Sequence, residues 1–169
     1  MHHSNDAANT VRSGMRHDVA ACVSTWVSAC AARDGHAFDG VAERARPKFD
    51  DAIVWLVAGD AEDVDGFVLV TAPGSGTTDD PIDAAVVGLL AVRPDRQARG
   101  LGRALLLAAQ QQLVHLGHER AVLHTLDDNA AALRLYESEG WRPYGDPFEH
   151  TLLKRPARTY IRDLPGPAR

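Results

Sequence analysis

The chain has few cysteines, no long apolar run and no excess of basic residues, and each shortage excludes a class of protein. Its two cysteines, Cys22 and Cys30, fall in one predicted helix about 12 Å apart along the axis, too far for a disulfide. No Cys or His spacing matches a metal site. The longest apolar run is too short to span a bilayer, and no signal segment is recognisable. We therefore expect a cytoplasmic protein with no metal and no membrane association.

Acidic residues outnumber basic ones, so that the 169 residues carry a net charge of -5. This charge argues against a nucleic-acid-binding protein that uses a broad basic face. With 45% hydrophobic residues, the chain is long enough to bury one core. We expect a mobile start at 1–9, a single domain at 10–155, and a C-terminal tail at 156–169, where three prolines fall without periodicity.

Hydrophobic periodicity predicts an alternation of strands and helices. Strands are expected at 10–12, 53–58, 66–71, 86–92, 121–126, 142–144 and 149–154, and helices at 18–33, 38–45, 103–116 and from 130 onward. An acidic turn at 59–63 joins the second and third strands, and a Gly- and Pro-rich loop at 73–81 precedes the fourth. Gly117 stands where a left-handed cap would end the third helix.

The most informative segment runs from the apolar strand 86–92 through Pro94 into a turn with Gly100 and Gly102, which opens a helix. Four arginines surround this turn: Arg93, Arg96, Arg99 and Arg103. A helix N-terminus offers unpaired backbone N–H groups and the positive end of a dipole, and glycines let an anion approach that backbone closely. An ordinary solvated turn would explain the arginines or the glycines alone, but the combination indicates a phosphate-binding turn.

Motif spacing narrows the choice of phosphate ligand. The dinucleotide fingerprint G-x-G-x-x-G/A needs a small residue where this chain has Leu105, and the P-loop motif is absent. What remains is Gln97-x-x-Gly100-x-Gly102, preceded by Val92-Arg93-Pro94. These residues resemble the signature of the GNAT superfamily of acyl-CoA-dependent N-acetyltransferases, V-x-P followed by [QR]-x-x-G-x-[GA] at a helix start.

A second motif extends the resemblance. After the strand at 121–126, the segment from Asn129 to Trp141 matches every fixed position of the GNAT pattern N-x-x-A-x-x-L-Y-x-x-x-G-[FW]. The two motifs stand in the family's order. The predicted order of elements carries the resemblance over roughly residues 11–155.

The resemblance implies the GNAT fold, an α/β (α+β) architecture with a central mixed, mostly antiparallel, splayed sheet of six to seven strands and about four helices. It also implies acetyl-CoA as the acyl donor, with the pyrophosphate on backbone amides of 98–103 and the pantetheine arm along a free strand edge. The implied cofactor-binding residues are Leu90, Ala91, Val92, Gln97, Ala98, Arg99, Gly100, Leu101, Gly102, Arg103, Asn129 and Tyr136. Asn129 would also serve as a helix N-cap.

Catalytic roles follow from the same resemblance. Tyr136 corresponds to the general acid that protonates the leaving thiolate, although a core aromatic residue would also suit its position. The strand at 86–92 lacks the glutamate that many members use as a base, whereas His124 stands twelve positions before the tyrosine, where others carry one. An imidazole can accept a proton at neutral pH, but a buried histidine with satisfied nitrogens is an equal alternative. Asp83, Glu149 and His150 are weaker candidates.

The implied reaction is direct attack of a primary amine on the thioester in a ternary complex. The family's acceptor region corresponds to residues 33–48 and the last strand pair, where acidic groups such as Asp34, Asp39 and Glu43 would suit a cationic amine. Taken singly, each of these residues is more typical of a solvated loop. The expected partner is therefore a small-molecule or peptide amine, and the expected assembly is a monomer or homodimer. The alternative function is an acyl-CoA-binding sensor that has lost efficient chemistry.

Overall fold

The computed structural model describes residues 10–60, 62–97 and 99–166, so the expectations for residues 1–9 and for Ala98 lie outside the described ranges. The described strands are β1 (Val11–Ser13), β2 (Ala52–Asp60), β3 (Asp63–Thr71), β4 (Ala84–Val92), β5 (Arg120–Leu126), β6 (Arg142–Glu149) and β7 (Pro156–Asp163). The α-helices are α1 (Val19–Asp34), α2 (Val41–Ala45), α3 (Leu101–His115) and α4 (Ala130–Ser138). None of these helices has the length and apolarity needed to cross a membrane.

The strands form one mixed sheet in the order β1-β2-β3-β4-β5-β7-β6. Only β4 and β5 run parallel, and α3 makes the crossover between them. The other neighbouring pairs are antiparallel. The predicted fold class, a mixed and mostly antiparallel sheet flanked by helices, is therefore confirmed.

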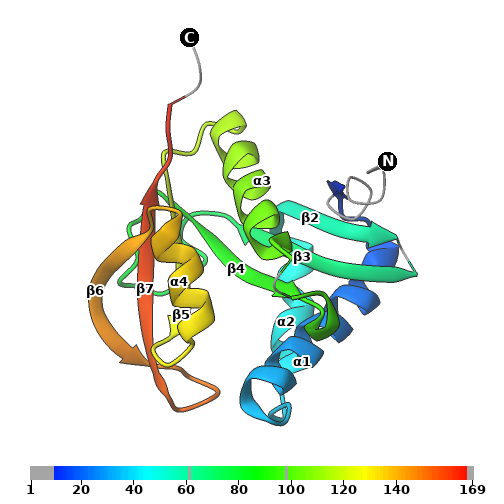
Figure 1. Cartoon of the computed structure of the whole chain (residues 1–169). Coiled ribbons are helices and arrows are strands. Elements are labelled where there is room, and N and C mark those ends of the chain that lie inside the picture. The colour runs from blue at the N-terminus through cyan, green and yellow to red at the C-terminus, as the bar shows by residue number, and fades with distance from the viewer. Residues whose placement is uncertain (1–9, 61, 98, 167–169) are drawn as a thin grey trace.

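β4 and β5 separate part of the way along their length. Their pairing ends at Val87 and Leu123, whereas β4 continues to Val92 and β5 to Leu126. We call this point of separation the fork; Figure 1 shows the two strands diverging beyond it. A β-bulge in the pairing of β3 with β4 falls at the same level, because Leu69 pairs with Leu89 and Val70 with Val87, which leaves Gly88 without an opposite residue. Such a bulge bends the strand.

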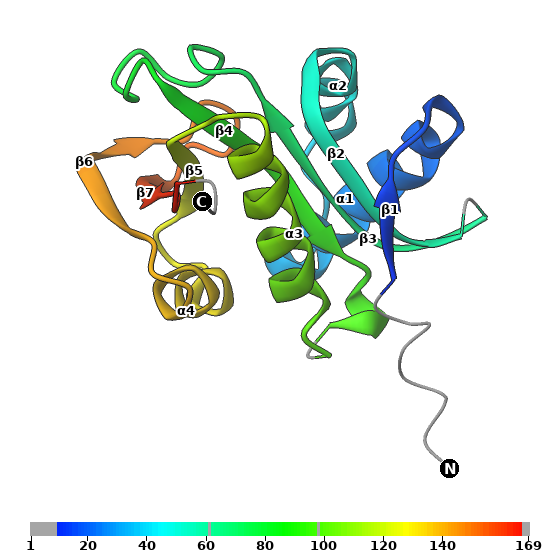
Figure 2. The same ribbon diagram turned by 90° about the horizontal axis from the view of Figure 1, so that it is seen from above.

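Helices cover both faces of the sheet (Figure 2). On one face, α3 buries Leu105, Leu106, Ala109 and Leu113 against β2, β3 and β4, in a cluster to which Trp141 and Tyr160 also belong. On the other face, α1 and the segment after α2 bury Cys22, Phe49, Phe67 and Leu89. The helical spacing of the α3 residues explains the first layer, because those positions share one side of a helix. Gly117 ends α3 with a φ of 90°, as predicted.

The last two strands differ from the prediction. A strand was expected at 149–154 and a tail from 156, but residues 150–154 form a turn and Pro156–Asp163 form β7. His150 Nδ1 accepts hydrogen bonds from the amides of Leu152 (3.2 Å) and Leu153 (3.0 Å), which bends the chain there. β7 pairs with β5 on one side and β6 on the other, so this part of the expected tail is an interior strand of the sheet.

Two other segments differ in extent. The helix expected at 38–45 is the shorter α2, and the chain continues through Pro47 as a 3₁₀ helix, Arg46–Asp51, rather than stopping there. The expected acidic turn at 59–63 belongs mostly to β2 and β3, which extend to Asp60 and from Asp63. Pro47 does not end the helical segment, because it lies in the first turn of the 3₁₀ helix, where its missing N–H leaves no hydrogen bond unmade.

Candidate functional site

The turn before α3 presents free backbone N–H groups, as its glycines predicted. Gly100 has a φ of 77° and its carbonyl accepts the first helical hydrogen bond, from Ala104 N at 3.0 Å. The amides of Leu101, Gly102 and Arg103 donate no hydrogen bond to the described residues. Three donors at the positive end of a 15-residue helix are therefore available to an anion.

Gly102 borders a slot between β4 and α4. A Cβ atom at this position would lie 3.8 Å from a methyl carbon of Val92 and 3.8 Å from a methyl carbon of Leu135. These are ordinary contact distances, so the fold itself does not require glycine here. The missing side chain leaves the space between the two side chains open beside the free amides.

The arginines around this turn are mostly bound by carboxylates. Arg93 forms ion pairs with Asp63 and Asp95, and Arg96 forms one with Asp65. These contacts join the turn to β3 rather than leaving the charges of Arg93 and Arg96 for a ligand.

Arg103 and Arg99 differ from these two. Arg103 donates to Glu139 Oε1 at 2.6 Å and to Ser138 Oγ at 3.0 Å, which ties α3 to the end of α4. Arg99 is exposed and forms no ion pair with a described residue. Arg99 is thus the arginine whose charge remains available beside the free amides.

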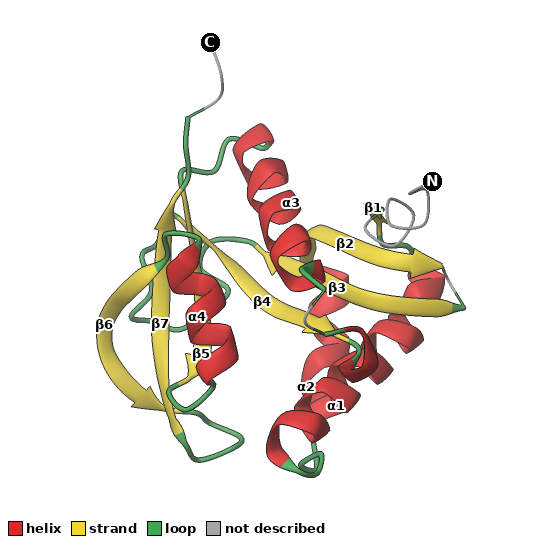
Figure 3. Ribbon diagram, in the orientation of Figure 1, coloured by secondary structure: helices red, strands yellow, loops and turns green. Residues whose placement is uncertain are grey.

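The end of β4 has a free edge. From Leu89 to Val92, β4 pairs with β3 on one side and with no described strand on the other. Leu90, Ala91 and Val92 lie in this part, and Gln97 Nε2 donates to the Val92 carbonyl at 3.3 Å. A strand with one free edge can pair with an extended ligand through its backbone. Figure 3 shows α3 beside the end of β4, and α4 beside β5 and β7.

α4 carries the two residues singled out by the second motif. Asn129 caps the helix, because its Oδ1 accepts from the Ala132 amide at 3.4 Å. Tyr136 is half-buried in the cluster with Trp141 and Tyr160, with ring centroids 6.3 and 6.4 Å away. Burial raises the pKa of Tyr136 to about 12. Its hydroxyl forms no hydrogen bond within the described part of the chain, and at neutral pH it is a protonated donor.

His124 lies on β5 at the fork. Its Nε2 is 3.0 Å from both carboxylate oxygens of Asp80, a side chain that is only 6% exposed. The Thr77 amide donates to the same carboxylate at 2.9 Å, which holds the loop between β3 and β4 in place. Phe148 packs edge-on to the imidazole, with centroids 5.7 Å apart. Asp80 is the residue that the sequence analysis missed, because a loop residue has no periodic pattern to reveal its partner.

Tyr136 and His124 approach the fork from opposite faces of the sheet. Tyr136 packs in the buried cluster on the α3 face of the sheet. Val122, two positions before His124 on β5, belongs to a different buried cluster on the opposite face. Because successive side chains of a strand alternate between faces, His124 shares the face of Val122. Both residues therefore lie near the level at which the pairing of β4 with β5 ends, His124 directly after the last paired residue of β5 and Tyr136 beside Tyr160, which pairs with that last residue.

The weaker candidates for a base lie elsewhere or are occupied. Asp83 forms an ion pair with Arg120, before the fork, and Glu149 is an exposed residue at the end of β6. His150 uses Nδ1 to accept two backbone amides, and its pKa is lowered by burial and by nearby cations.

Asp34, expected to attract a cationic acceptor, is instead part of the framework. Its side chain is 3% exposed and forms ion pairs with Arg33 (2.7 Å) and Arg155 (2.8 Å). Those guanidinium groups lower the pKa of Asp34 to about 2. Its charge is compensated inside the protein, which corrects the expectation for this residue. Asp39 and Glu43 are exposed.

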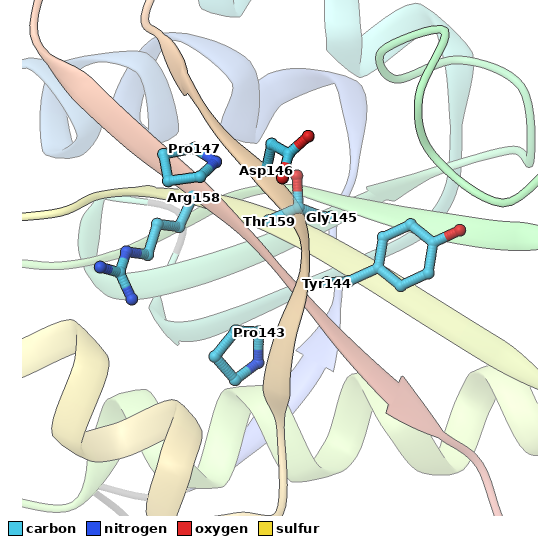
Figure 4. Close-up of a pocket in the computed structure, with 7 residues that line it drawn as sticks. All are labelled: Pro143, Tyr144, Gly145, Asp146, Pro147, Arg158 and Thr159. Atoms are coloured by element: carbon cyan, nitrogen blue, oxygen red, sulfur yellow. The ribbon is translucent and has the colours of Figure 1, made fainter.

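A pocket lies on the strand pair β6 and β7 (Figure 4). It is lined by residues 143–147 of β6, where the pairing with β7 is interrupted, and by Arg158 and Thr159 of β7. None of the sequence-predicted site residues lines it. Within the described residues, no group of three or more His, Cys, Asp or Glu side chains is arranged to hold a metal ion.

Comparison with known proteins assigns the family. Residues 23–141 match the acetyltransferase (GNAT) family. The chain therefore belongs to this family, as its two motifs predicted. The match contains the strand β4, the turn before α3, and the whole of α4.

Individual relatives agree with this assignment. A mycothiol acetyltransferase of Nocardiopsis dassonvillei is 36% identical over 133 residues, which cover 69% of this chain and 38% of the relative. The chain spans well under half the length of such relatives. Among solved structures, the ribosomal-protein-S18-alanine N-acetyltransferase of Escherichia coli superposes with a TM-score of 0.67 at 21% identity, covering 95% of this chain and 96% of that one. PaiA N-acetyltransferase of Thermoplasma acidophilum, in complex with coenzyme A, gives 0.70 at 14% identity, covering 91% and 98%. These structures share the fold.

Proposed function

We propose that this enzyme transfers an acetyl group from acetyl-CoA to a primary amine, by direct attack within a ternary complex. The observation that supports the proposal most is the set of free amides at residues 101–103, next to the free edge of β4 and the fork. A diphosphate needs clustered donors, and an extended thioester arm needs an unpaired strand edge. Both features meet at the start of α3.

In this proposal the pyrophosphate accepts hydrogen bonds from the amides of Leu101, Gly102 and Arg103, with Arg99 as the nearby free cation. The pantetheine arm runs along Gly88–Val92 and through the slot beside Gly102. The thioester then lies at the fork, where Tyr136 and His124 approach from the two faces. Asn129 holds the start of α4, which positions Tyr136.

The chemistry requires two proton transfers. The amine nitrogen attacks the thioester carbon, the C–S bond breaks, and the Tyr136 hydroxyl donates a proton to the departing thiolate. The new ammonium centre loses its proton to His124, directly or through water. No acyl-cysteine is needed. Cys22 is fully buried in α1, and burial raises the pKa of its thiol to about 12. Such a thiol does not form a nucleophilic thiolate at neutral pH.

Asp80 gives His124 a defined tautomer in this mechanism. A carboxylate that accepts a hydrogen bond from Nε2 keeps the proton on that nitrogen, which leaves the Nδ1 lone pair free to accept one. Asp80 is therefore a positioning residue and His124 the base. This pair supplies a proton acceptor at the fork although β4 contains no ionisable residue, so the structure does not favour the alternative of a non-catalytic sensor.

Release of free thiol from acetyl-CoA with a panel of amines tests the proposal. Because the relatives are named mycothiol acetyltransferases, mycothiol-type amines belong in the panel beside amino acids, polyamines and peptides. We expect Tyr136→Phe to lower kcat about 10²-fold or more, since it removes the proton donor, while the affinity for coenzyme A measured by calorimetry stays within about twofold. Equal kcat in the two proteins would remove Tyr136 from the mechanism.

His124→Gln tests the base separately. We expect this variant to lose both rate and the acidic limb of the pH profile of kcat/KM, because no imidazole remains to be protonated. Asp80→Asn serves as the companion variant and lowers the rate with His124 still present. A pH profile of His124→Gln identical to that of the original enzyme would leave His124 with a structural role only.

A further inference from the structure

We propose that the acceptor amine carries an anionic group, which Arg44 and Lys48 bind beside the fork. This inference rests on the proposed function and narrows its acceptor to a chemical class. It also differs from the sequence expectation, in which carboxylates of residues 33–48 would attract a cationic acceptor.

Lys48 reaches the fork from the side opposite α3. Its Nζ lies 3.8 Å from the position that a Cβ atom would take at Gly88, the first residue of β4 beyond the last pair with β5. The next residue, Phe49, packs in the same buried cluster as Leu89, which places this segment on the α1 face of the sheet. The ammonium group therefore stands at the end of the opening through which an acceptor would meet the thioester.

Arg44 acts together with Lys48. It precedes Lys48 by four positions along α2 and the following 3₁₀ helix, so the two side chains lie near each other on consecutive turns. Burial and the Arg44 charge lower the pKa of Lys48. Both cations also lower the pKa of His150, after the effect of its burial and together with Arg33 and Arg155. The positive charges thus converge on the turn between β6 and β7.

The buried carboxylates of this region, Asp34 and Asp80, already have partners. Asp34 binds Arg33 and Arg155, Arg155 also binds Asp128 at 2.8 Å, and Asp80 faces His124. Arg44 and Lys48 form no ion pair with any described residue, and the exposed Asp39, Glu43 and Glu149 make no such contact with them. Two neighbouring cations repel each other, and an anion placed between them would relieve that repulsion.

His150 offers a third donor. Because its Nδ1 accepts the amides of Leu152 and Leu153, the neutral ring carries its proton on Nε2. Burial, and after it the surrounding cations, lower the pKa of His150, which keeps the ring neutral and this tautomer in place. A guanidinium, an ammonium and an imidazole N–H form a donor set suited to a carboxylate or a phosphate.

This cluster is distinct from the coenzyme A site of the proposed function. The free amides of α3 lie beyond Val92, at the far end of the free edge, whereas Lys48 lies at Gly88, where that edge begins. The two cation sites also stand on opposite faces of the sheet. The acidic groups of the donor and of the acceptor would therefore be held separately, with the fork between them.

Matched acceptor pairs test the inference. Thiol release is measured with β-alanine against β-alaninamide, and with phosphoethanolamine against ethanolamine, so that the pairs separate a carboxylate from a phosphate. We expect the anionic member of at least one pair to have a kcat/KM about tenfold higher or more. Lys48→Met and Arg44→Gln should reduce that ratio towards one through KM, without lowering the rate on the neutral member. Lys48→Arg, which keeps the positive charge, should retain much of the preference for the anionic acceptor.

Arg46→Gln is the matched control, because it removes the same charge from the same segment but Arg46 is not among the cations that act on His150. The ratio of kcat/KM for the anionic and the neutral acceptor should be the same in Arg46→Gln as in the original enzyme. The inference fails if the original enzyme prefers neither anionic member, or if Arg46→Gln lowers the ratio as much as Lys48→Met. Absence of thiol release with every amine would instead refute the proposed function, and this inference with it.

Discussion

Two glycines at the start of α3 act in different ways. Gly100 has a φ of 77°, a region in which other residues cost about 1–2 kcal/mol, and so it allows the sharp entry into the helix. Gly102 is an ordinary helical residue whose missing side chain leaves the slot between Val92 and Leu135 open. Gly100 is therefore needed for its backbone conformation, whereas Gly102 matters because it has no side chain.

Gly102→Ala separates stability from binding. Alanine at a helical position is about 1 kcal/mol more favourable than glycine, and its Cβ meets only ordinary contacts here, so thermal unfolding should shift upward. The same methyl group occupies the proposed path of the cofactor, and the affinity for coenzyme A should fall about tenfold or more. Calorimetric titration beside a thermal melt measures both effects. A variant that is more stable and binds coenzyme A equally well would show that the slot is not the binding path.

At the scale of elements, Asp34 fastens the end of α1 to the turn before β7. The carboxylate is 3% exposed and is shared by Arg33 and Arg155, the second of which lies far along the chain. This ion pair holds the segment after α1 close to the turn that contains His150. The acceptor region is therefore assembled from parts that the sheet alone does not bring together.

The pH dependence of stability tests this junction. Because its arginine partners lower the pKa of Asp34 to about 2, from an ordinary value of 3.8, the folded state is stabilised above pH 4 and loses that stabilisation as the pH falls towards 2. We expect Asp34→Asn to lose about 2 kcal/mol of unfolding free energy at pH 7 and to lack this part of the acid limb. Denaturant unfolding of both proteins at several pH values measures this difference in the free energy of unfolding. Parallel pH curves for the two proteins would contradict the assignment.

At the scale of the whole molecule, β7 is an interior strand that joins the edge strand β6 to the rest of the sheet. Its residues pair with β5 along the full length of that strand and with β6 on the other side, and Tyr160 and Ile161 are almost completely buried. Removing an interior strand exposes both neighbours. The region expected to be a tail is therefore required for the fold.

Truncation tests that requirement. A chain that ends at Arg155 should lack a cooperative thermal transition, because β5 and β6 lose their shared partner, whereas a chain that ends at Gly166 should melt as the full chain does. Circular dichroism with temperature provides the comparison. A folded, cooperative protein ending at Arg155 would contradict the role given to β7.

Much of the fold could be predicted because its signals are local. The spacing of Leu106, Ala109 and Leu113 indicated α3, and the apolar run of β4 indicated a buried strand. β7 was missed because it begins with proline and contains Arg158 and Arg162, whose charged ends reach partners on α4 and its flanking turns. The turn at 150–154 could not be predicted, because a turn held by hydrogen bonds to the His150 side chain has no periodic pattern in the sequence.

The candidate site was only partly predictable for the same reason. The free amides before α3 follow from glycine and helix geometry, and so the sequence sufficed for them. Ion pairs between residues far apart in the sequence cannot be predicted in this way. Such ion pairs give Arg93 and Arg96 carboxylate partners, whereas Arg44 and Lys48 have none among the described residues. The partnership of Asp80 with His124 likewise depends on where a long loop folds over the sheet.

The central claim is that the backbone amides at the start of α3 bind the pyrophosphate of coenzyme A. An NMR titration of the ¹⁵N-labelled protein with coenzyme A, and in parallel with pantetheine, which lacks the pyrophosphate, tests it most directly. We predict that coenzyme A shifts the amide signals of Leu101, Gly102 and Arg103 strongly and that pantetheine does not. Unchanged signals from these three amides at saturating coenzyme A, with shifts elsewhere in the chain, would contradict the claim.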